Sequence, residues 1–168
     1  MTPLHKVREF FKTLPFPLEV ILFDESTKTS PLAAKALGVE VGQIAKTLVF
    51  TGRANGEERK GRAVVVTSGD ARVDTKKLKK LVAFKPHFAG HEEVEELTGF
   101  PPGGVCPFAL PDDFPVYIDV SMKRFPVVYA AGGTANSAVP ITVEQLLVAT
   151  RGTLCDVCEG YKSENKEK

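Results

Sequence analysis

The sequence predicts an α+β fold in which helices surround a mixed, largely antiparallel β-sheet with a barrel-like core. Runs of β-branched residues outnumber the helical segments and come partly in adjacent pairs. The 168 residues are 43% hydrophobic and 26% charged, as in an ordinary globular domain. No repeat, low-complexity block or change in composition divides the chain. We therefore expect one domain over residues 1–158 and a polar C-terminal tail over 159–168.

The N-terminal third contains clear helix boundaries. A hydroxyl cap followed by proline is typical of a helix start, and apolar residues then recur at helical spacing until two prolines follow. A glycine directly after a short apolar segment is typical of a helix end. These signals predict a helix from Pro3 to Leu14, a strand at Leu18–Phe23 and a helix at Ser30–Leu37.

Two β-branched runs near the middle of the chain predict a hairpin. They span Ile44–Phe50 and Arg62–Thr67, and the polar loop between them contains Asn55-Gly56, a turn signal. The charged residues of this loop indicate a solvated tip.

The remaining elements follow from capping residues and short apolar runs. Asp74 can cap a lysine-rich helix that directs Leu78 and Leu81 inward, and Thr142 with Gln145 forms a capping box. The other expected elements are a helix at His91–Leu97, strands at Val116–Val120 and Val127–Ala131, and a helix at Val143–Ala149.

Charge and cysteine content exclude several classes of protein. Lys and Arg number 22 against 21 for Asp and Glu, so a binder driven by overall charge is disfavoured. A local basic face remains possible on the segment with Arg72, Lys76, Lys77, Lys79 and Lys80. No apolar run is long enough to span a bilayer or form a signal peptide. Three cysteines do not form a disulfide framework, so we expect a cytoplasmic protein without membrane contact.

Lys46 is the most informative single residue. In a strand over Ile44–Phe50 it shares a face with three large apolar residues, where an ammonium is costly to bury without an anionic partner. Periodicity alone leaves two interpretations equally open: a binding lysine, or a lysine whose long stem reaches water.

Two glycine-rich loops could bring backbone N–H groups close to a ligand. The first, residues 101–107, has prolines at both ends and paired glycines, so it could offer donors to a carbonyl oxygen that becomes negative during ester cleavage. On its local sequence alone, an ordinary rigid turn is the favoured interpretation. The second, residues 131–136, lacks the spacing of a phosphate-binding fingerprint.

No metal or thiol chemistry is indicated. Cys155 and Cys158 form a C-x-x-C pair, but a structural zinc site requires two further ligands and the histidines are scattered. We therefore expect no metal and no cofactor.

The order of the motifs resembles the YbaK-type aminoacyl-tRNA editing domain, which also occurs as an insertion in bacterial prolyl-tRNA synthetases and as free-standing prolyl-tRNA editing proteins. The resemblance runs from about Leu18 to Leu154. It rests on residues 33–38, 43–50, 68–74, 98–99, 103–108, 116–119 and 130–133.

The resemblance implies roles for particular residues. Lys46, Gly103 and Gly104 match the catalytic positions, the lysine holding the terminal nucleotide or its ester and the loop amides lying beside the aminoacyl carbonyl. Water is then activated with help from the substrate's own ribose hydroxyl. The expected substrate-binding residues are Thr47, Ser68, Asp70, Val105, Cys106, Pro107, Gly132, Gly133 and Asn136. Some members have Asp or His where this chain offers Asn136, and small residues other than cysteine are common at the position of Cys106.

The resemblance thus implies a hydrolase that removes a wrong amino acid from transfer RNA in trans. Alanine on proline tRNA is the leading substrate, and cysteine, serine or threonine is the alternative. A non-catalytic domain that binds tRNA ends or a synthetase is a further alternative. The expected partners are the acceptor end of mischarged tRNA and a synthetase, whereas the oligomeric state is open.

Overall fold

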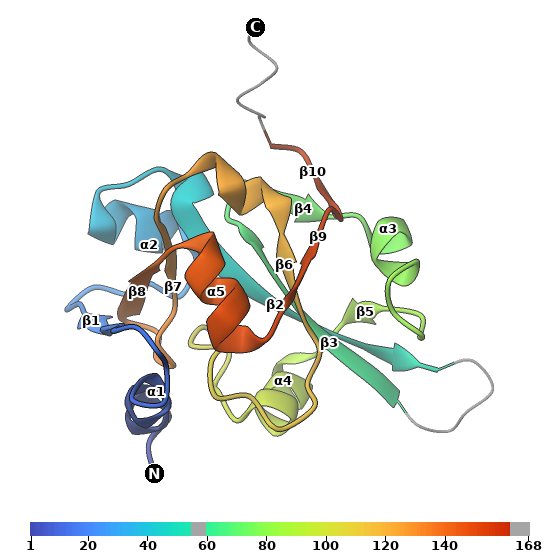
Figure 1. The fold of residues 1–168 in the computed structure, drawn as a ribbon, viewed down its shortest axis with the longest axis horizontal. Coiled ribbons are helices and arrows are strands. Elements are labelled where there is room, and N and C mark those ends of the chain that lie inside the picture. Colours follow the sequence, from blue (N-terminus) through green and yellow to red (C-terminus); the bar gives the residue numbers. More distant parts are fainter. Residues whose placement is uncertain (55–59, 162–168) are drawn as a thin grey trace, which may run out of the picture.

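The computed structural model describes residues 1–54 and 60–161 of the chain (Figure 1). The helices are α1 (Pro3–Phe11), α2 (Ser30–Leu37), α3 (Thr75–Lys79), α4 (His91–Thr98) and α5 (Val143–Thr150), with 3-10 helices η1 (Val41–Gln43) and η2 (Val120–Arg124). The strands are β1 (Ile21–Leu22), β2 (Ile44–Arg53), β3 (Lys60–Ser68), β4 (Arg72–Val73), β5 (His87–Phe88), β6 (Val116–Asp119), β7 (Val128–Ala130), β8 (Ser137–Ile141), β9 (Thr153–Cys155) and β10 (Cys158–Glu159).

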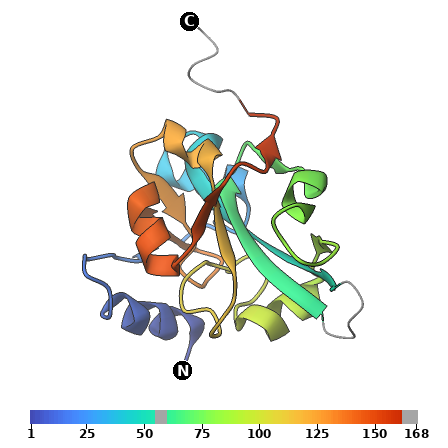
Figure 2. The same cartoon turned by 45° about the vertical axis from the view of Figure 1, so that its right-hand side comes forward.

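One mixed sheet organises the fold. Its strands lie in the order β1-β8-β7-β2-β3-β6-β9, β5 adds to β2, and β4 pairs separately with β10. Strand β2 is antiparallel to β3, whereas the pairs β2–β7, β3–β6 and β6–β9 are parallel. Figure 2 shows the long β2–β3 hairpin with β6 and β9 beyond β3. The predicted α+β class with a mixed sheet is confirmed.

The β2–β3 hairpin is longer than the sequence predicts. Its register runs from Ala45 opposite Ser68 to Arg53 opposite Lys60. The predicted turn at Asn55-Gly56 lies outside the described residues.

The edge of β2 away from β3 has a gap in its pairing. Strand β7 pairs with Ile44 and Ala45 at one end, and β5 pairs with Phe50 and Thr51 further along. No strand of the described chain pairs with residues 46–49 on this edge. Figure 1 shows β7 and β5 reaching β2 at separate places.

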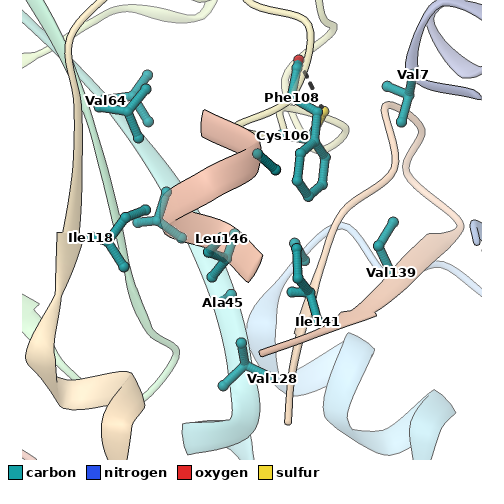
Figure 3. Packing of buried hydrophobic residues seen from close by; sticks show 14 of the residues in the cluster. Val7, Ala45, Val64, Cys106, Phe108, Ile118, Val128, Val139, Ile141 and Leu146 are labelled. Carbon is teal, nitrogen blue, oxygen red and sulfur yellow. Dashed lines mark hydrogen bonds between the residues drawn. The ribbon is translucent and has the colours of Figure 1, made fainter. Parts of the chain in front are cut away.

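The main core lies on one face of the β2–β3 hairpin. It joins Ala45 of β2, Val64 of β3, Ile118 of β6 and Leu146 of α5, which belong to one cluster of buried side chains (Figure 3). A smaller cluster on the other face joins Phe50, Val65, Leu78, Val157 and Cys158. Because side chains alternate along a strand, residues that are neighbours on β2 belong to different clusters.

Several sequence predictions differ from the structure. Helix α1 ends at Phe11, and only Ile21–Leu22 of the predicted strand at residues 18–23 is paired. Leu81 is 47% exposed rather than inward, because α3 ends at Lys79 and the chain turns away. Strands β4, β5, β8, β9 and β10 were not expected; four of them contain only two or three residues, too few for periodicity to show.

The last described residues of the chain form a strand pair with an earlier segment. Glu159, expected at the start of the tail, pairs with Arg72 in the β10–β4 ladder. Residues 162–168 of the tail predicted at 159–168 lie outside the described residues, and the division at 158 stays a prediction. No helix in the described chain has the length and apolar character that crossing a membrane requires.

Candidate active site

Lys46 lies on β2, on the face away from the main core. Its side chain is partly buried, and its Nζ donates a hydrogen bond of 2.6 Å to the carbonyl oxygen of Ala71. Burial lowers the pKa of Lys46 below its ordinary value, and the nearby Cys158 and Asp70 act in the opposite direction. An ammonium has three N–H donors, so the bond to Ala71 orients the group and leaves two donors for other partners.

Asp70, the residue directly before Ala71, is fixed in place by Arg124. Asp70 accepts two hydrogen bonds from Arg124, 2.9 Å from Nη1 and 2.6 Å from Nη2. The same guanidinium donates from Nε to the carbonyl of Ser121 at 2.7 Å and lies over the ring of Phe125. A bidentate guanidinium–carboxylate pair fixes orientation as well as distance, so this loop is well positioned.

A cavity of about 400 Å³ opens beside Lys46. Residues 44–49 of β2 form one wall, so the cavity lies at the unpaired edge of that strand. Its other walls come from the segment before α2 (residues 27–30), from α2 and α4, from the first glycine-rich loop and from the β7–β8 connection. Many of the lining side chains are small, namely Ala33, Ala45, Ala89, Ala130, Ala131 and Ala138.

The structure brings four predicted site residues together at this cavity: Lys46, Thr47, Gly103 and Val105. They come from β2 and from a loop more than fifty residues later in the chain. A lysine and a flexible-backbone loop thus share one concave site.

Within the first glycine-rich loop the residues have different surroundings. Gly103 has a φ of +89°, a conformation that favours glycine, and it faces the cavity. The N–H of Gly104 donates to the carbonyl of Pro101 at 2.9 Å, so this amide is already used within the turn. Cys106 is fully buried in the main core, where its thiol donates to the carbonyl of Phe108 (Figure 3). Pro107 lines a second cavity elsewhere.

The second glycine-rich loop does not line the cavity beyond Ala131. Gly132 donates its N–H to Ser137 Oγ at 2.9 Å, and Gly133 has a φ of +99° and packs near Phe100. Asn136 donates from its side chain to the carbonyl of Phe23 at 2.9 Å and accepts from Thr134. These contacts join β1 to the loop before β8.

Ser68 and Asp70 also lie outside the cavity. Ser68 is fully buried, and its N–H donates to Ser121 Oγ. Asp70 reaches the site only through the neighbouring carbonyl of Ala71. The structure therefore gives both residues surroundings suited to holding the β3–β4 connection.

The cysteines are free thiols in buried surroundings. Burial raises the pKa of Cys106, Cys155 and Cys158 to about 12 each. Cys158 lies 3.0 Å from Thr67 Oγ1, and Val157 donates its N–H to Asp119. Within the part of the chain that the structure describes, no group of three His, Cys, Asp or Glu residues is placed to hold a metal ion.

Several lining residues were missed by the sequence analysis. Phe88 is 59% exposed at the cavity, and Thr27, Lys28 and His91 also line it. The first helical turn of α2 was predicted, but nothing in the sequence indicates that this end of the helix meets β2. Phe88, a large aromatic residue between two predicted helices, was the signal in the sequence that could have pointed to a lining residue.

The sequence matches one family of proteins. The family described as the aminoacyl-tRNA editing domain matches residues 24–148. The chain is also 38% identical to YwhH of Bacillus subtilis over 160 residues, which cover 95% of this chain and 99% of YwhH. The chain therefore belongs to the aminoacyl-tRNA editing domain family.

Other relatives agree with this assignment. EbsC of Enterococcus faecalis, a proposed Cys-tRNA(Pro)/Cys-tRNA(Cys) deacylase, is 27% identical over 94% of this chain and 89% of its own length. A proline–tRNA ligase of Limosilactobacillus fermentum is 32% identical over 54% of this chain but only 16% of the ligase. This domain thus resembles a part of that larger enzyme.

Solved structures share the whole architecture. The crystal structure of a proposed trans-editing enzyme for prolyl-tRNA synthetase superposes with a TM-score of 0.84 at 38% identity, covering 95% of this chain and 99% of the other. The hypothetical protein APE2540 gives a TM-score of 0.82 at 33% identity, covering 92% and 99%. The prediction of a hydrolase that acts on mischarged aminoacyl-tRNA is confirmed at the level of the family.

Proposed function

We propose that this protein is a trans-acting deacylase that removes alanine from mischarged proline tRNA. The observation that carries the proposal is the meeting of Lys46 and Gly103 at one cavity lined largely by small side chains. The ammonium supplies a positive charge at one side of the cavity. At another side, the glycine loop lets backbone N–H groups come close to a substrate. Both are suited to an ester whose carbonyl oxygen gains charge during hydrolysis.

The reaction needs only water as co-substrate. Water attacks the ester carbonyl, the bond from the carbonyl carbon to the ribose oxygen breaks, and that oxygen leaves with a proton. Lys46 would orient a phosphate or ester oxygen through the donors that it does not direct to Ala71. Gly103 and Val105 line the cavity, so their amides are the candidate donors of this loop, whereas the amide of Gly104 is directed to Pro101.

Small wrong amino acids are the substrates for which such an enzyme is needed. A synthetase for proline rejects a smaller side chain weakly, because each missing methylene costs only about 1–3 kcal/mol. A second site with close walls can then admit alanine and exclude proline. The six lining alanines support a narrow acyl pocket. Cysteine is the main competing substrate, because EbsC is a proposed deacylase for it.

The acceptor end of tRNA is the proposed binding partner. The basic residues of α3 and its neighbours would contact the phosphate backbone, whereas the cavity would take the terminal aminoacyl-adenosine. A prolyl-tRNA synthetase is the proposed source of the mischarged substrate. Such a role would place the protein in the cytoplasm.

A deacylation panel tests the proposal. Purified protein is incubated with proline tRNA carrying alanine, cysteine, serine, threonine or proline, and release of each amino acid is followed. We expect the alanine ester to be hydrolysed at least tenfold faster than the proline ester. Faster hydrolysis of the cysteine ester would replace the proposed substrate, and equal rates on the alanine and proline esters would exclude an editing role.

A further inference from the structure

The unpaired edge of β2 exposes backbone groups to the cavity. Residues 46–49 have neither a β7 nor a β5 partner, and all four line the cavity. An open strand edge presents N–H and C=O groups that would otherwise pair with another strand. Those of these groups that point away from β3 and have no partner in the protein need one from water or from a ligand.

The direction of these groups can be worked out from a neighbouring hydrogen bond. The carbonyl of Val49 accepts from the N–H of Ala89 at 3.0 Å, on the side of β5. In a strand the N–H and C=O of one residue point to the same side, and this side alternates between successive residues. The N–H and C=O of Thr47, two residues before Val49, therefore point into the gap between β7 and β5.

The side chain of Thr47 adds a second unused group. Among the described residues its Oγ1 is buried and has no hydrogen-bond partner. Two other hydroxyls around the cavity are engaged: Thr27 donates to the carbonyl of Ser137, and Thr29 accepts from Leu32. Thr47 itself is only partly buried and lines the cavity, and a change of its χ1 rotamer on binding would turn the hydroxyl toward a ligand.

The cavity offers no negative charge to a cationic group of the substrate. No Asp or Glu is among the described residues that line it. A free aminoacyl ester nevertheless carries an α-amino group, which donates two or three hydrogen bonds and must be received by neutral acceptors. The side chains of Lys46 and Thr47 alternate across the strand, so the Thr47 hydroxyl belongs to the opposite face from the Lys46 ammonium.

We propose that Thr47 forms the subsite for the substrate's α-amino group, which donates to the Thr47 carbonyl and hydroxyl in the gap between β7 and β5. The Thr47 N–H, which points the same way, would complement an oxygen of the acyl group. Thr47 then recognises the α-amino group, which all aminoacyl esters share, whereas the walls of the cavity select among amino acid side chains. This inference rests on the proposed deacylase function.

The test compares two acyl groups that differ only at the α-position. Alanyl-tRNA is compared with lactyl-tRNA, in which a hydroxyl replaces the amine, and each rate is divided by its own spontaneous hydrolysis rate at the same pH. An acceptor bonded to a charged donor is expected to favour the alanyl ester by roughly 10- to 100-fold in kcat/KM. Thr47→Val should reduce this ratio severalfold, whereas Thr47→Ser, which keeps the hydroxyl, should retain it.

The outcomes separate the subsite from the enzymatic function. Hydrolysis of neither ester by the wild-type protein would contradict the deacylase function itself. Hydrolysis of both esters with equal corrected rates, or an unchanged ratio in Thr47→Val, would overturn the subsite alone. Thermal unfolding without substrate provides a check on folding: Thr47→Val replaces an unpartnered hydroxyl by a methyl of similar shape, so its Tm should equal or exceed that of the wild type.

Discussion

Arg124 donates two hydrogen bonds to the carboxylate of Asp70, although the residues lie 54 positions apart in the sequence. Asp70 directly precedes Ala71, whose carbonyl accepts the hydrogen bond from Lys46. The ion pair therefore sets the position of the acceptor that orients the ammonium. Asp70 and Arg124 are positioning residues under the proposed function.

The first prediction concerns this pair. Arg124→Ala should lower kcat by about tenfold or more, because the Ala71 carbonyl loses its support and a small misplacement of the ammonium weakens its contact with the substrate. Arg124→Lys should recover little, since a lysine cannot form the bidentate contact. The control is Arg62→Ala, which removes an arginine that also stacks on a ring and donates to a carbonyl but does not line the cavity.

A specific readout distinguishes positioning from a general loss of stability. The alkaline limb of the kcat profile should move to lower pH in Arg124→Ala, because Asp70, whose charge raises the pKa of Lys46, is no longer held in place. If the profile stays unchanged and kcat falls only in proportion to the unfolded fraction, the pair is merely structural.

The second prediction concerns Lys46 itself. Lys46→Met keeps the apolar stem and removes the ammonium, so hydrolysis should fall to background. Burial lowers the pKa of Lys46 in the folded protein, which means that its charged form is disfavoured there relative to the unfolded chain. The wild-type free energy of unfolding should therefore rise with pH between the lowered pKa and the ordinary value of about 10.4.

Lys46→Met should lack this rise with pH and should be at least as stable as the wild type at pH 7. Urea unfolding at several pH values measures both effects, and Lys12→Met, a change at an exposed lysine, is the control. A large loss of stability with unchanged activity per folded molecule would show that Lys46 is structural.

The sequence could indicate Lys46 but not its surroundings. Strands β2 and β3 are long and β-branched, so their existence and the face of Lys46 follow from alternation. The Asp70–Arg124 pair joins a turn to a 3-10 helix, and no local pattern marks such a contact. The gap at residues 46–49 depends on where β7 and β5 stop, which is a property of tertiary packing.

Other misses have local physical causes. Strand β8 contains Pro140, which removes an N–H and makes the segment resemble a loop in the sequence. Cys106 and Asn136 have polar atoms that suit a site, but they are occupied by the carbonyls of Phe108 and Phe23. Which polar groups find internal partners can be read only from the folded chain.

The third prediction concerns the C-terminal cysteines. Their pKa of about 12 keeps them protonated near neutral pH, so alkylation of the folded protein should be slow. The double variant Cys155→Ser with Cys158→Ser, and treatment of the wild type with a chelator, should each leave kcat/KM within about a few-fold of wild type. Mass spectrometry after iodoacetamide and the deacylation assay provide the measurements. Activity that a chelator removes and zinc restores would contradict the prediction.

The last prediction concerns Gly103 and separates backbone strain from a role in the site. Gly103 has a φ of +89°, and an added Cβ would lie 3.1 Å from Lys28 Cβ at the cavity. Gly103→Ala should therefore distort the loop beside the proposed carbonyl position. Loss of one such donor is worth roughly 3 kcal/mol, so kcat should fall by about a hundredfold.

The matched control is Gly38→Ala, because Gly38 also has a positive φ, +72°, and an added Cβ there meets nothing within 4 Å. Both variants carry the cost of alanine at positive φ, about 1 kcal/mol, so both should lose some thermal stability. Only Gly103→Ala should lose activity once rates are expressed per folded molecule. If the two variants keep the same kcat, the loop is a rigid turn and the carbonyl must be held by other groups around the cavity.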